Sequence, residues 1–412
     1  MSDKQTEFKA ISLKICIISC VFPPEPVVSA NLAYDLALAL SENHQVTVLS
    51  PRPSRPMGYN FSSPADSKYP FSHNTLNSFT HPKSAFVGRF RESYSFGKAC
   101  TKYINKHHKE IDVIYMNTWP LFGQFVAVKA AKKYNIPTIL HIQDIYPEAF
   151  IQKLPAFLKY FAFKILFPVE KYVTAKSTRI VTISSGMKNM LVKTRNISPT
   201  KIEVVYNWQD ESKFLSVVHN GSSKLSDALI HFMFLGSLGP VANIDNLILA
   251  LSQLKGNDIQ LTIAGEGSEK TKLQRLAKDL KNTKVKFIHA PASEAGKIQS
   301  TADVLLLSLK KGAAGLALPS KLPAYMFSAK PIIATVDHDS DTANAIREAG
   351  CGWVVEPENP TALAAMMQTV HAMPTDELNA MGLKGRNYAL EHFSKHSNLS
   401  KLVSIIEEVA KK

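Results

Sequence analysis

The stretch KICIISCVFPPEPVVSANLAYDLALALSENHQVTVLS, residues 14–50, indicates the fold class of the chain. It opens with an apolar run and a Pro-rich loop over residues 14–26, and the apolar run has the length and composition of a buried strand. Residues 29–42 predict a helix, because Ser29 is a good N-cap and leucines and alanines recur on one face. A second apolar run at 45–50 predicts another strand. Strand, loop, helix and strand in this order are typical of a parallel α/β sheet.

The same alternation continues along a chain of 412 residues, which is long enough for two domains. Apolar runs predict further strands at 112–117, 137–144, 179–184 and 202–210, whereas residues 51–100 have the character of long loops plus a helix. After a stretch rich in Ser, Gly and Asn, the pattern restarts. We therefore expect an α/β protein with two Rossmann-like domains, whose parallel sheets face each other across a deep cleft. The expected parts are a first domain (1–212), a linker (213–228) and a second domain (229–392).

Charge and cysteine content restrict the class of protein further. The net charge of +14 comes mainly from residues 1–210, which hold 26 Lys and Arg against 14 Asp and Glu. Four scattered cysteines, Cys16, Cys20, Cys100 and Cys351, argue against a disulfide framework or a zinc site and predict reduced thiols. The first residues lack a signal-peptide pattern, and no stretch reaches the roughly 18 uninterrupted apolar residues of a membrane span. These features predict a cytoplasmic protein that does not cross a membrane.

Three turns in the second half have the composition of anion-binding sites. GSLG (236–239) and AGEG (264–267) each follow an apolar strand and precede a helix, and their glycines allow backbone N–H groups to approach a phosphate. The third turn, Pro319-Ser320-Lys321, opens a short predicted helix at 321–329, which Ser320 can cap. A lysine at a helix N-terminus is mildly unfavourable unless an anion lies beside it. A bound diphosphate explains this placement; the alternative is an ordinary capped helix with a solvated lysine, next to glycine turns that are purely structural.

A cluster of acidic residues lies at 337–341. Asp337, Asp339 and Asp341 superficially match an Asp-x-Asp metal motif, but a polar loop that caps the helix at Thr342 is the simpler interpretation. We expect no metal and no cofactor.

Eight segments follow one another along roughly residues 14–400: VFPPEP with SANLAYDLALAL, LHIQDIYPEAF, IVTISSGMKNML, VVYNWQD, FLGSLGP with IDNLILAL, LTIAGEG, PSKLPAYMFSAKPIIA, and IREAGCGWVVEPEN. In this order they resemble the family-4 retaining glycosyltransferases. The resemblance is greatest to the sugar transferases that build bacterial O-antigen, capsule or colanic-acid chains. The resemblance implies a GT-B fold, with an N-terminal acceptor domain, a C-terminal nucleotide-sugar domain, and a last helix (393–412) that crosses back to the first domain.

The resemblance also implies roles for individual residues. The donor diphosphate would lie against the Gly236 loop and the Ser320-Lys321 turn, with the second glycine loop lining the nucleotide. His141 and Asp144 would face the donor sugar, and the segment Pro24–Asn31 would approach the reacting centre. The implied donor-binding residues are Gly236, Ser237, Gly265, Glu266, Gly267, Pro319, Ser320 and Lys321. The implied catalytic residues are His141, Asp144 and Lys321, and the acceptor-side residues are Val28, Ser29, Asn31, Glu148 and Asn207.

The sequence departs from the family pattern at three places. Ser237, Ala242 and Asn243 stand where many relatives carry the Arg and Lys that bind the diphosphate. The family's pair of glutamates falls at Leu316 and Ala324, and a common glycine pair is here Val27-Val28. These departures concentrate anion binding on Lys321 and the backbone N–H groups.

The implied reaction is transfer of a sugar from a nucleotide-diphosphate-sugar with retention at the anomeric carbon. No nucleophile with an adjacent base is evident, so a front-face displacement is expected, in which the leaving phosphate takes the proton of the acceptor hydroxyl. Two other interpretations stay open: a GT-B nucleotide-sugar epimerase, and a catalytically inactive binding protein on the same fold. His141 and Asp144 also have structural interpretations, as a buried strand-end histidine and a helix cap.

The basic half of the chain suggests a partner. Residues 51–200 hold 22 Lys and Arg against 7 Asp and Glu, with aromatic residues interleaved at 86–109 and 157–172. In the second segment one helical face gathers Phe157, Leu158, Phe161 and Ile165, with Lys164 and Lys171 turned elsewhere. An anionic membrane surface and a core helix with a solvated basic face both fit this pattern. We expect a peripheral protein at the inner face of the cytoplasmic membrane that acts on a polyprenyl-diphosphate-linked glycan; no nucleic-acid-binding module appears.

Overall fold

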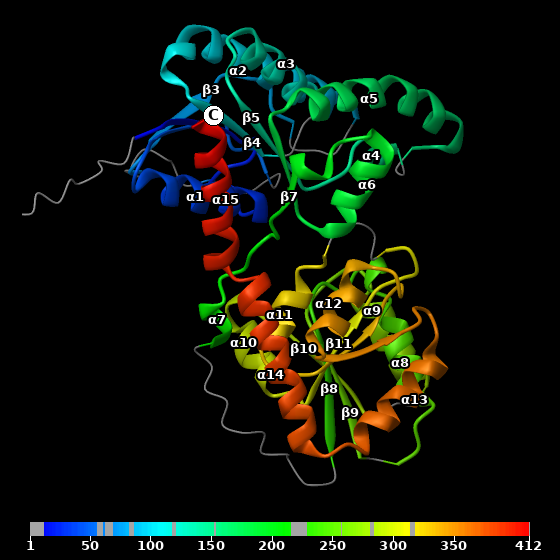
Figure 1. Cartoon of the computed structure of the whole chain (residues 1–412). Coiled ribbons are helices and arrows are strands. Elements are labelled where there is room, and N and C mark those ends of the chain that lie inside the picture. The colour runs from blue at the N-terminus through cyan, green and yellow to red at the C-terminus, as the bar shows by residue number, and fades with distance from the viewer. Residues whose placement is uncertain are drawn as a thin grey trace, which may run out of the picture. The chain divides into compact units, whose positions relative to one another are not determined.

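The computed structural model describes residues 12–55, 61, 69–81, 86–117, 121–151, 154–215, 229–256, 258–280, 284–313 and 318–411. Contacts between residues divide the chain into two compact units, coloured from blue to red along the chain in Figure 1. The first unit comprises residues 1–205 and 399–412, and the second comprises residues 206–398. Most of the predicted linker, residues 216–228, lies outside the described part.

The first unit is built on a parallel sheet with the strand order β3-β2-β1-β4-β5-β6-β7. The central strands are almost fully buried, as expected for a parallel sheet covered by helices on both faces. The predicted strand at 202–210 is confirmed only over its first residues. The strands are β1 (Lys14–Ile18), β2 (Gln45–Pro51), β3 (Ser72–Leu76), β4 (Val113–Asn117), β5 (Thr138–Ile142), β6 (Arg179–Thr182) and β7 (Ile202–Val204).

The helices of the first unit connect successive strands and cover the sheet. One prediction about them is wrong: α1 begins at Val28, and its N-cap is Val27, without a side-chain hydrogen bond. The Ser29 hydroxyl instead donates to Gln143 Oε1, 2.8 Å away. The helices are α1 (Val28–Ser41), α2 (Phe86–His107), α3 (Leu121–Lys133), α4 (Glu148–Ile151), α5 (Ala156–Lys176) and α6 (Ser185–Arg195).

The second unit repeats this architecture with a parallel sheet of order β10-β9-β8-β11-β12-β13. Alternate residues of β8 point to opposite faces: Phe232 and Phe234 join one core cluster, whereas Met233 joins the other. Helices therefore cover both faces of the sheet. The strands are β8 (Ile230–Leu235), β9 (Ile259–Ala264), β10 (Val285–Ile288), β11 (Val304–Ser308), β12 (Ile332–Thr335) and β13 (Gly352–Val355). The helices are α7 (Ser212–Leu215), α8 (Ile244–Ser252), α9 (Lys270–Asp279), α10 (Ala295–Ser300), α11 (Lys321–Phe327), α12 (Asp341–Ala349), α13 (Pro360–His371) and α14 (Thr375–His392).

The last helix, α15 (Lys395–Ala410), packs its final three turns on the first unit. Glu407 lies 2.9 Å from the His44 ring, and Glu408 lies 3.1 Å from the Arg179 guanidinium. The first unit is thus assembled from both ends of the chain.

All four cysteines are free thiols, as the sequence predicts; Cys16, Cys100 and Cys351 are buried, whereas Cys20 is only partly buried. Within the described ranges, no helix combines the length and apolarity needed to cross a membrane.

Candidate functional site

The carboxyl ends of β8 and β9 form two stacked glycine turns in the second unit. Gly236 and Gly265 both have positive φ, +153° and +141°, a region that L side chains rarely adopt. A Cβ on Gly265 would overlap with the Gly236 carbonyl, and one on Gly267 would overlap with the Leu238 backbone. Glycine is therefore required for the two turns to pack against each other. This close packing brings backbone groups of both turns to one edge of the sheet, where ligands of such folds bind.

Lys321 extends over the first of these turns. Its side chain occupies the space where a Cβ on Gly236 would lie, and its Nζ sits 4.4 Å from the centre of the Phe234 ring. Burial lowers the pKa of this ammonium to about 8. In the described part of the chain, no carboxylate forms a salt bridge with Lys321. Lys321 is thus a half-buried cation with an aromatic ring beneath it and, among the described residues, no carboxylate partner.

Lys321 is held in place by the short helix that it opens. Apart from Lys321 itself, every residue of α11 is buried. The Tyr325 hydroxyl donates to the Leu235 carbonyl at 2.9 Å and accepts from the Leu235 N–H at 2.8 Å. These bonds tie the helix to the end of β8, next to Gly236. The backbone position of Lys321 is therefore set by the buried core.

The predicted capping by Ser320 is wrong. Ser320 occupies the N-cap position, but its φ and ψ of −58° and −17° are helical and its side chain makes no capping bond. Its carbonyl instead accepts a hydrogen bond from Gln209 Nε2. Pro319 accepts from the Leu322 N–H at 3.0 Å and so starts the first turn of α11. Leu316, one of the two positions of the family's glutamate pair, lies outside the described residues, and the other, Ala324, is buried.

The remaining predicted donor residues are more exposed. Ser237 lies at the surface of the first turn. The Glu266 carboxylate is already paired, 2.7 Å from Lys270 Nζ and 3.1 Å from His289 Nδ1, and the hydrogen bond from Lys270 lowers its pKa. A nucleotide contact of the Glu266 side chain stays a prediction, whereas its carbonyl has a clear role, accepting from the Leu238 N–H at 2.9 Å.

In the first unit, His141 lies in β5 and is only 1% exposed. Its Nδ1 is 2.6 Å from the Tyr115 hydroxyl on neighbouring β4. Burial lowers the pKa of His141 to about 4, so the imidazole is neutral near pH 7. This histidine can form hydrogen bonds but cannot supply a positive charge to a reaction. Asp144, two residues beyond β5, is exposed and lines a small pocket between α3 and α5.

The acceptor-side residues Val28, Ser29 and Asn31 lie in the first turn of α1, which begins one residue before the predicted helix. Val28 and Asn31 are exposed, and Ser29 contacts the ends of two strands. Its hydroxyl donates to Gln143 after β5, and its carbonyl accepts from Asn117 Nδ2 at 3.3 Å. Sequence reasoning missed Asn117 and Gln143, although both are polar residues at strand ends, the place where such a sheet gathers functional groups.

Glu148 is part of a buried ionic cluster. Its carboxylate lies 2.7 Å from the guanidinium of Arg195, which also pairs with Glu170 at 3.0 Å. Arg195 and Glu170 are buried, and burial raises the pKa of Glu170 to about 7 although Arg195 opposes the shift. The cluster joins α4, α5 and α6, so Glu148 has a structural function that the sequence did not suggest.

Asn207 falls in the second unit, although it was predicted as an acceptor-side residue of the first domain. The segment that contains it connects to the Lys321 turn through the hydrogen bond from Gln209 to Ser320. This segment therefore belongs structurally with the predicted donor residues.

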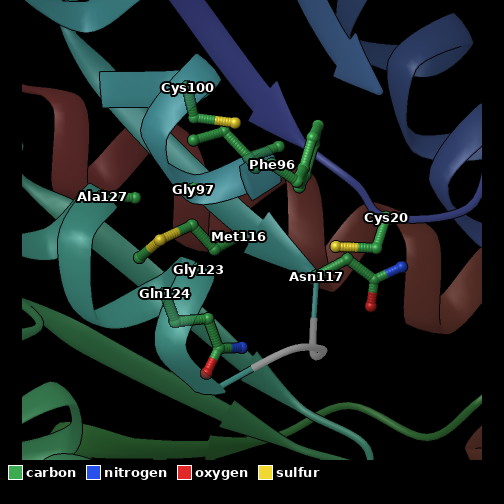
Figure 2. Close-up of a pocket in the computed structure, with 10 residues that line it drawn as sticks. Cys20, Phe96, Gly97, Cys100, Met116, Asn117, Gly123, Gln124 and Ala127 are labelled. Carbon is green, nitrogen blue, oxygen red and sulfur yellow. The ribbon is translucent and has the colours of Figure 1, made fainter. Parts of the chain in front are cut away.

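Figure 2 shows a second small pocket of the first unit, where α2, α3 and β4 meet. Cys20, Phe96, Cys100 and Met116 give it a mostly apolar lining, to which Asn117 and Gln124 add side-chain amides. Its volume of about 10 Å³ has room for no more than about one water molecule. This pocket is a packing defect and cannot hold a sugar.

The acidic cluster at 337–341 has structural partners. Asp337 accepts from the Gly312 N–H at 2.8 Å, and the Ser340 hydroxyl caps α12 by accepting from the Ala343 N–H. Among the described residues, no group of three or more His, Cys, Asp or Glu side chains is arranged to hold a metal.

Two family models match consecutive parts of the chain. Residues 29–213 match "Glycosyltransferase Family 4", and residues 221–388 match "Glycosyl transferases group 1". The probable glycosyltransferase WbjE of Pseudomonas aeruginosa is 22% identical over 302 residues, which cover 72% of this chain and 74% of the relative. The putative colanic acid biosynthesis glycosyl transferase WcaI of Escherichia coli K12 is 23% identical over 235 residues, 55% of this chain and 56% of the relative.

Among solved structures, Anabaena HepE in complex with UDP and glucose superposes with a TM-score of 0.62 at 16% identity. The superposition covers 96% of this chain and 99% of HepE. At this identity the likeness establishes a common fold of the whole chain.

Proposed function

We propose a retaining mechanism for this chain, which belongs to the family 4 and group 1 glycosyltransferases and has their GT-B fold. It moves a sugar from a nucleotide-diphosphate-sugar to a glycan acceptor, which we propose is carried on a polyprenyl diphosphate. The relation to a colanic acid transferase supports a place in the synthesis of a bacterial surface polysaccharide.

The observation that carries the donor assignment is the state of Lys321. Partial burial of an ammonium group is unfavourable in free energy unless an opposite charge lies beside it. The described residues provide no carboxylate partner for Lys321. The diphosphate of a nucleotide-sugar would supply that charge beside the two glycine turns, over the first of which Lys321 extends. The UDP bound to HepE supports this class of ligand on the same fold.

The chemical role of Lys321 follows from the place where negative charge develops during the reaction. As the bond from the sugar to the diphosphate breaks, negative charge grows on the leaving phosphate, and a fixed cation stabilises it without reorganisation. The leaving phosphate then takes the proton of the acceptor hydroxyl. We assign Lys321 this charge-stabilising role and propose that no metal is needed.

His141 and Asp144 are proposed to orient the sugar on the first unit. The imidazole is neutral, so its contribution is a hydrogen bond and not a full positive charge. The exposed Asp144 carboxylate can accept hydrogen bonds from sugar hydroxyls. We further propose that the protein works at an anionic membrane surface, where a lipid-linked acceptor resides and where the basic first half of the chain is attracted.

The test is release of nucleotide from nucleotide-sugars, with and without lipid extract, followed by NMR assignment of the anomeric configuration of the product. Release that increases with lipid acceptor and gives a retained linkage supports the proposal. Interconversion of sugars without transfer would identify an epimerase instead. Binding of a nucleoside diphosphate without turnover under any acceptor condition would identify an inactive binding protein.

A further inference from the structure

The amino-terminal half of α5 exposes a set of large apolar side chains. Phe157, Phe161 and Ile165 are 73%, 64% and 67% exposed, and Tyr160 is 60% exposed. No side chain from Ala156 to Ile165 is buried. In Figure 1 this end of α5 extends away from the sheet of its own unit. The alternative of a core helix with a solvated basic face is therefore wrong for this half of the helix.

The carboxyl-terminal half of the same helix is firmly packed. Its buried residues all lie from Leu166 onward, and Glu170 pairs with the buried Arg195. Phe167 receives the Phe163 ring at 4.8 Å on one side and the Arg195 guanidinium at 4.9 Å. A helical end of about ten residues gains little stability in water from its own hydrogen bonds. The amino-terminal half of α5 is therefore stabilised by its connection to the packed carboxyl-terminal half and by any surface that binds its exposed side chains.

The charges around the exposed side chains have one sign. From Leu154 to Val169 the chain carries Lys159 and Lys164 and no acidic residue. The Lys164 ammonium lies over the Tyr160 ring, 4.7 Å from its centre, so it borders the apolar set and is not turned away from it. Lysine and tyrosine have apolar stems and polar tips, the combination that suits the boundary between lipid headgroups and acyl chains.

We propose that the amino-terminal half of α5, residues 156–165, docks on an anionic bilayer by inserting Phe157, Phe161 and Ile165 into its interfacial layer. This inference rests on the proposed function, because it names the element through which an enzyme with a lipid-linked acceptor reaches the membrane. Lys159 and Lys164 then lie at the level of the anionic headgroups. A second copy of the chain is a poorer occupant, because self-association of this face would bring the lysines of two copies together.

The direct test is fluorescence of Phe161→Trp with vesicles of phosphatidylcholine and phosphatidylglycerol, and with phosphatidylcholine alone. The expected result is a blue shift and quenching by brominated lipid with the anionic vesicles only, measured against the wild-type tryptophan background. Leu383→Trp is the matched control, because Leu383 is an exposed apolar residue of the second unit at 51% exposure. No blue shift of the 161 variant, or an equal shift of the control, overturns the proposal.

Vesicle flotation separates the contribution of the apolar side chains to membrane binding from that of the lysines. Replacing both phenylalanines (Phe157→Ser with Phe161→Ser) or both lysines (Lys159→Gln with Lys164→Gln) should weaken binding to anionic vesicles by roughly tenfold or more. The charge-matched control, Lys255→Gln with Lys278→Gln, should bind like wild type. Unchanged flotation of both α5 variants overturns the proposal, as does a wild-type dimer in sedimentation that the phenylalanine variant dissociates.

These results are distinguishable from failure of the proposed function. The α5 variants should retain the wild-type thermal shift with nucleoside diphosphates, since none of the changed residues belongs to the Lys321 turn. Loss of that shift together with loss of vesicle binding would mean that the variants are misfolded and that α5 has a structural role, which overturns the docking assignment. A wild-type protein that floats with vesicles but never turns over a nucleotide-sugar would refute the enzyme and leave the docking helix established.

Discussion

At the level of single residues, Lys321 combines a positive charge, partial burial and an aromatic support. Because burial lowers its pKa to about 8, the ammonium loses its proton as the pH rises through about 8 in the free protein. A bound diphosphate favours the charged form and raises the pKa again.

Diphosphate affinity should therefore decrease between about pH 7.5 and 9 in the wild type. Titration calorimetry of a nucleoside diphosphate across this range measures the decrease. Lys321→Ala serves as the reference, because it retains every other titrating group of protein and nucleotide. Parallel pH profiles for the two proteins would show that Lys321 does not bind the diphosphate.

A second residue-level prediction concerns the two glycines of the turn at 236–239. Gly236→Ala places a Cβ on the Lys321 side chain at a φ of +153°, whereas a Cβ on Gly239 meets only Ser237 Oγ at 3.9 Å. Gly236→Ala should lower stability by about 1–3 kcal/mol and weaken diphosphate binding, and Gly239→Ala should change stability by less than about 0.5 kcal/mol. Thermal unfolding with and without nucleotide measures both effects. Equal stability of the two variants would contradict the requirement for glycine at the positive φ of Gly236, and equal diphosphate binding would contradict the packing of Lys321 on this turn.

At the level of elements, Arg195 connects three helices through two carboxylates and the Tyr146 carbonyl. Arg195→Met leaves Glu148 and Glu170 without their cation and should destabilise the first unit by about 3–5 kcal/mol near pH 8. Lys193→Met, at an exposed position of the same helix, should be nearly neutral.

The loss of folding stability caused by Arg195→Met should be smaller at lower pH. The folded-state pKa of Glu170 is raised to about 7, so the folded protein binds its proton below that value and the buried negative charge disappears. Chemical denaturation at pH 5.5 and pH 8 measures the difference. A penalty that is independent of pH would mean that Glu170 is not the group that Arg195 neutralises.

The elements were predicted from the sequence with uneven success, and the misses have physical causes. Apolar runs identify buried parallel strands, so β1, β2, β4 and β5 were found. The polar edge strand β3, SHNTL, lacks such a run and was missed. Ser29 has the residue type of an N-cap, but its hydroxyl bonds to Gln143, 114 residues away, and this partner is invisible to local rules.

The candidate site, like the elements, was predicted where the signal is local in the sequence and missed where it depends on distant residues. Glycine turns after strands and a lysine at a helix start are local signals, and the structure brings Gly236 and Lys321 into contact. The Arg195 cluster joins residues 25 and 47 positions apart, so no local pattern reveals it. The apolar face of α5 could be seen in the sequence, but only its exposure separates a core helix from a docking helix.

At the scale of the whole molecule, two parallel-sheet units and a chain that returns to the first unit at its end account for the match to glycosyltransferases along nearly its entire length. This architecture assigns the glycine turns and Lys321 to the second unit, and His141, Asp144 and α5 to the first. The proposed donor role therefore belongs to the second unit, and the proposed acceptor role belongs to the first.

The most direct test of the central assignment is the affinity for UDP, GDP, ADP, CDP and TDP, measured by titration calorimetry for wild type, Lys321→Met and Lys278→Met. Lys278 is an exposed lysine of the same unit and controls for the loss of one charge. We predict that wild type and Lys278→Met bind one of these nucleotides equally well and that Lys321→Met binds it roughly tenfold to a hundredfold more weakly. An unchanged affinity in a folded Lys321→Met protein would contradict the assignment of Lys321 to the donor diphosphate.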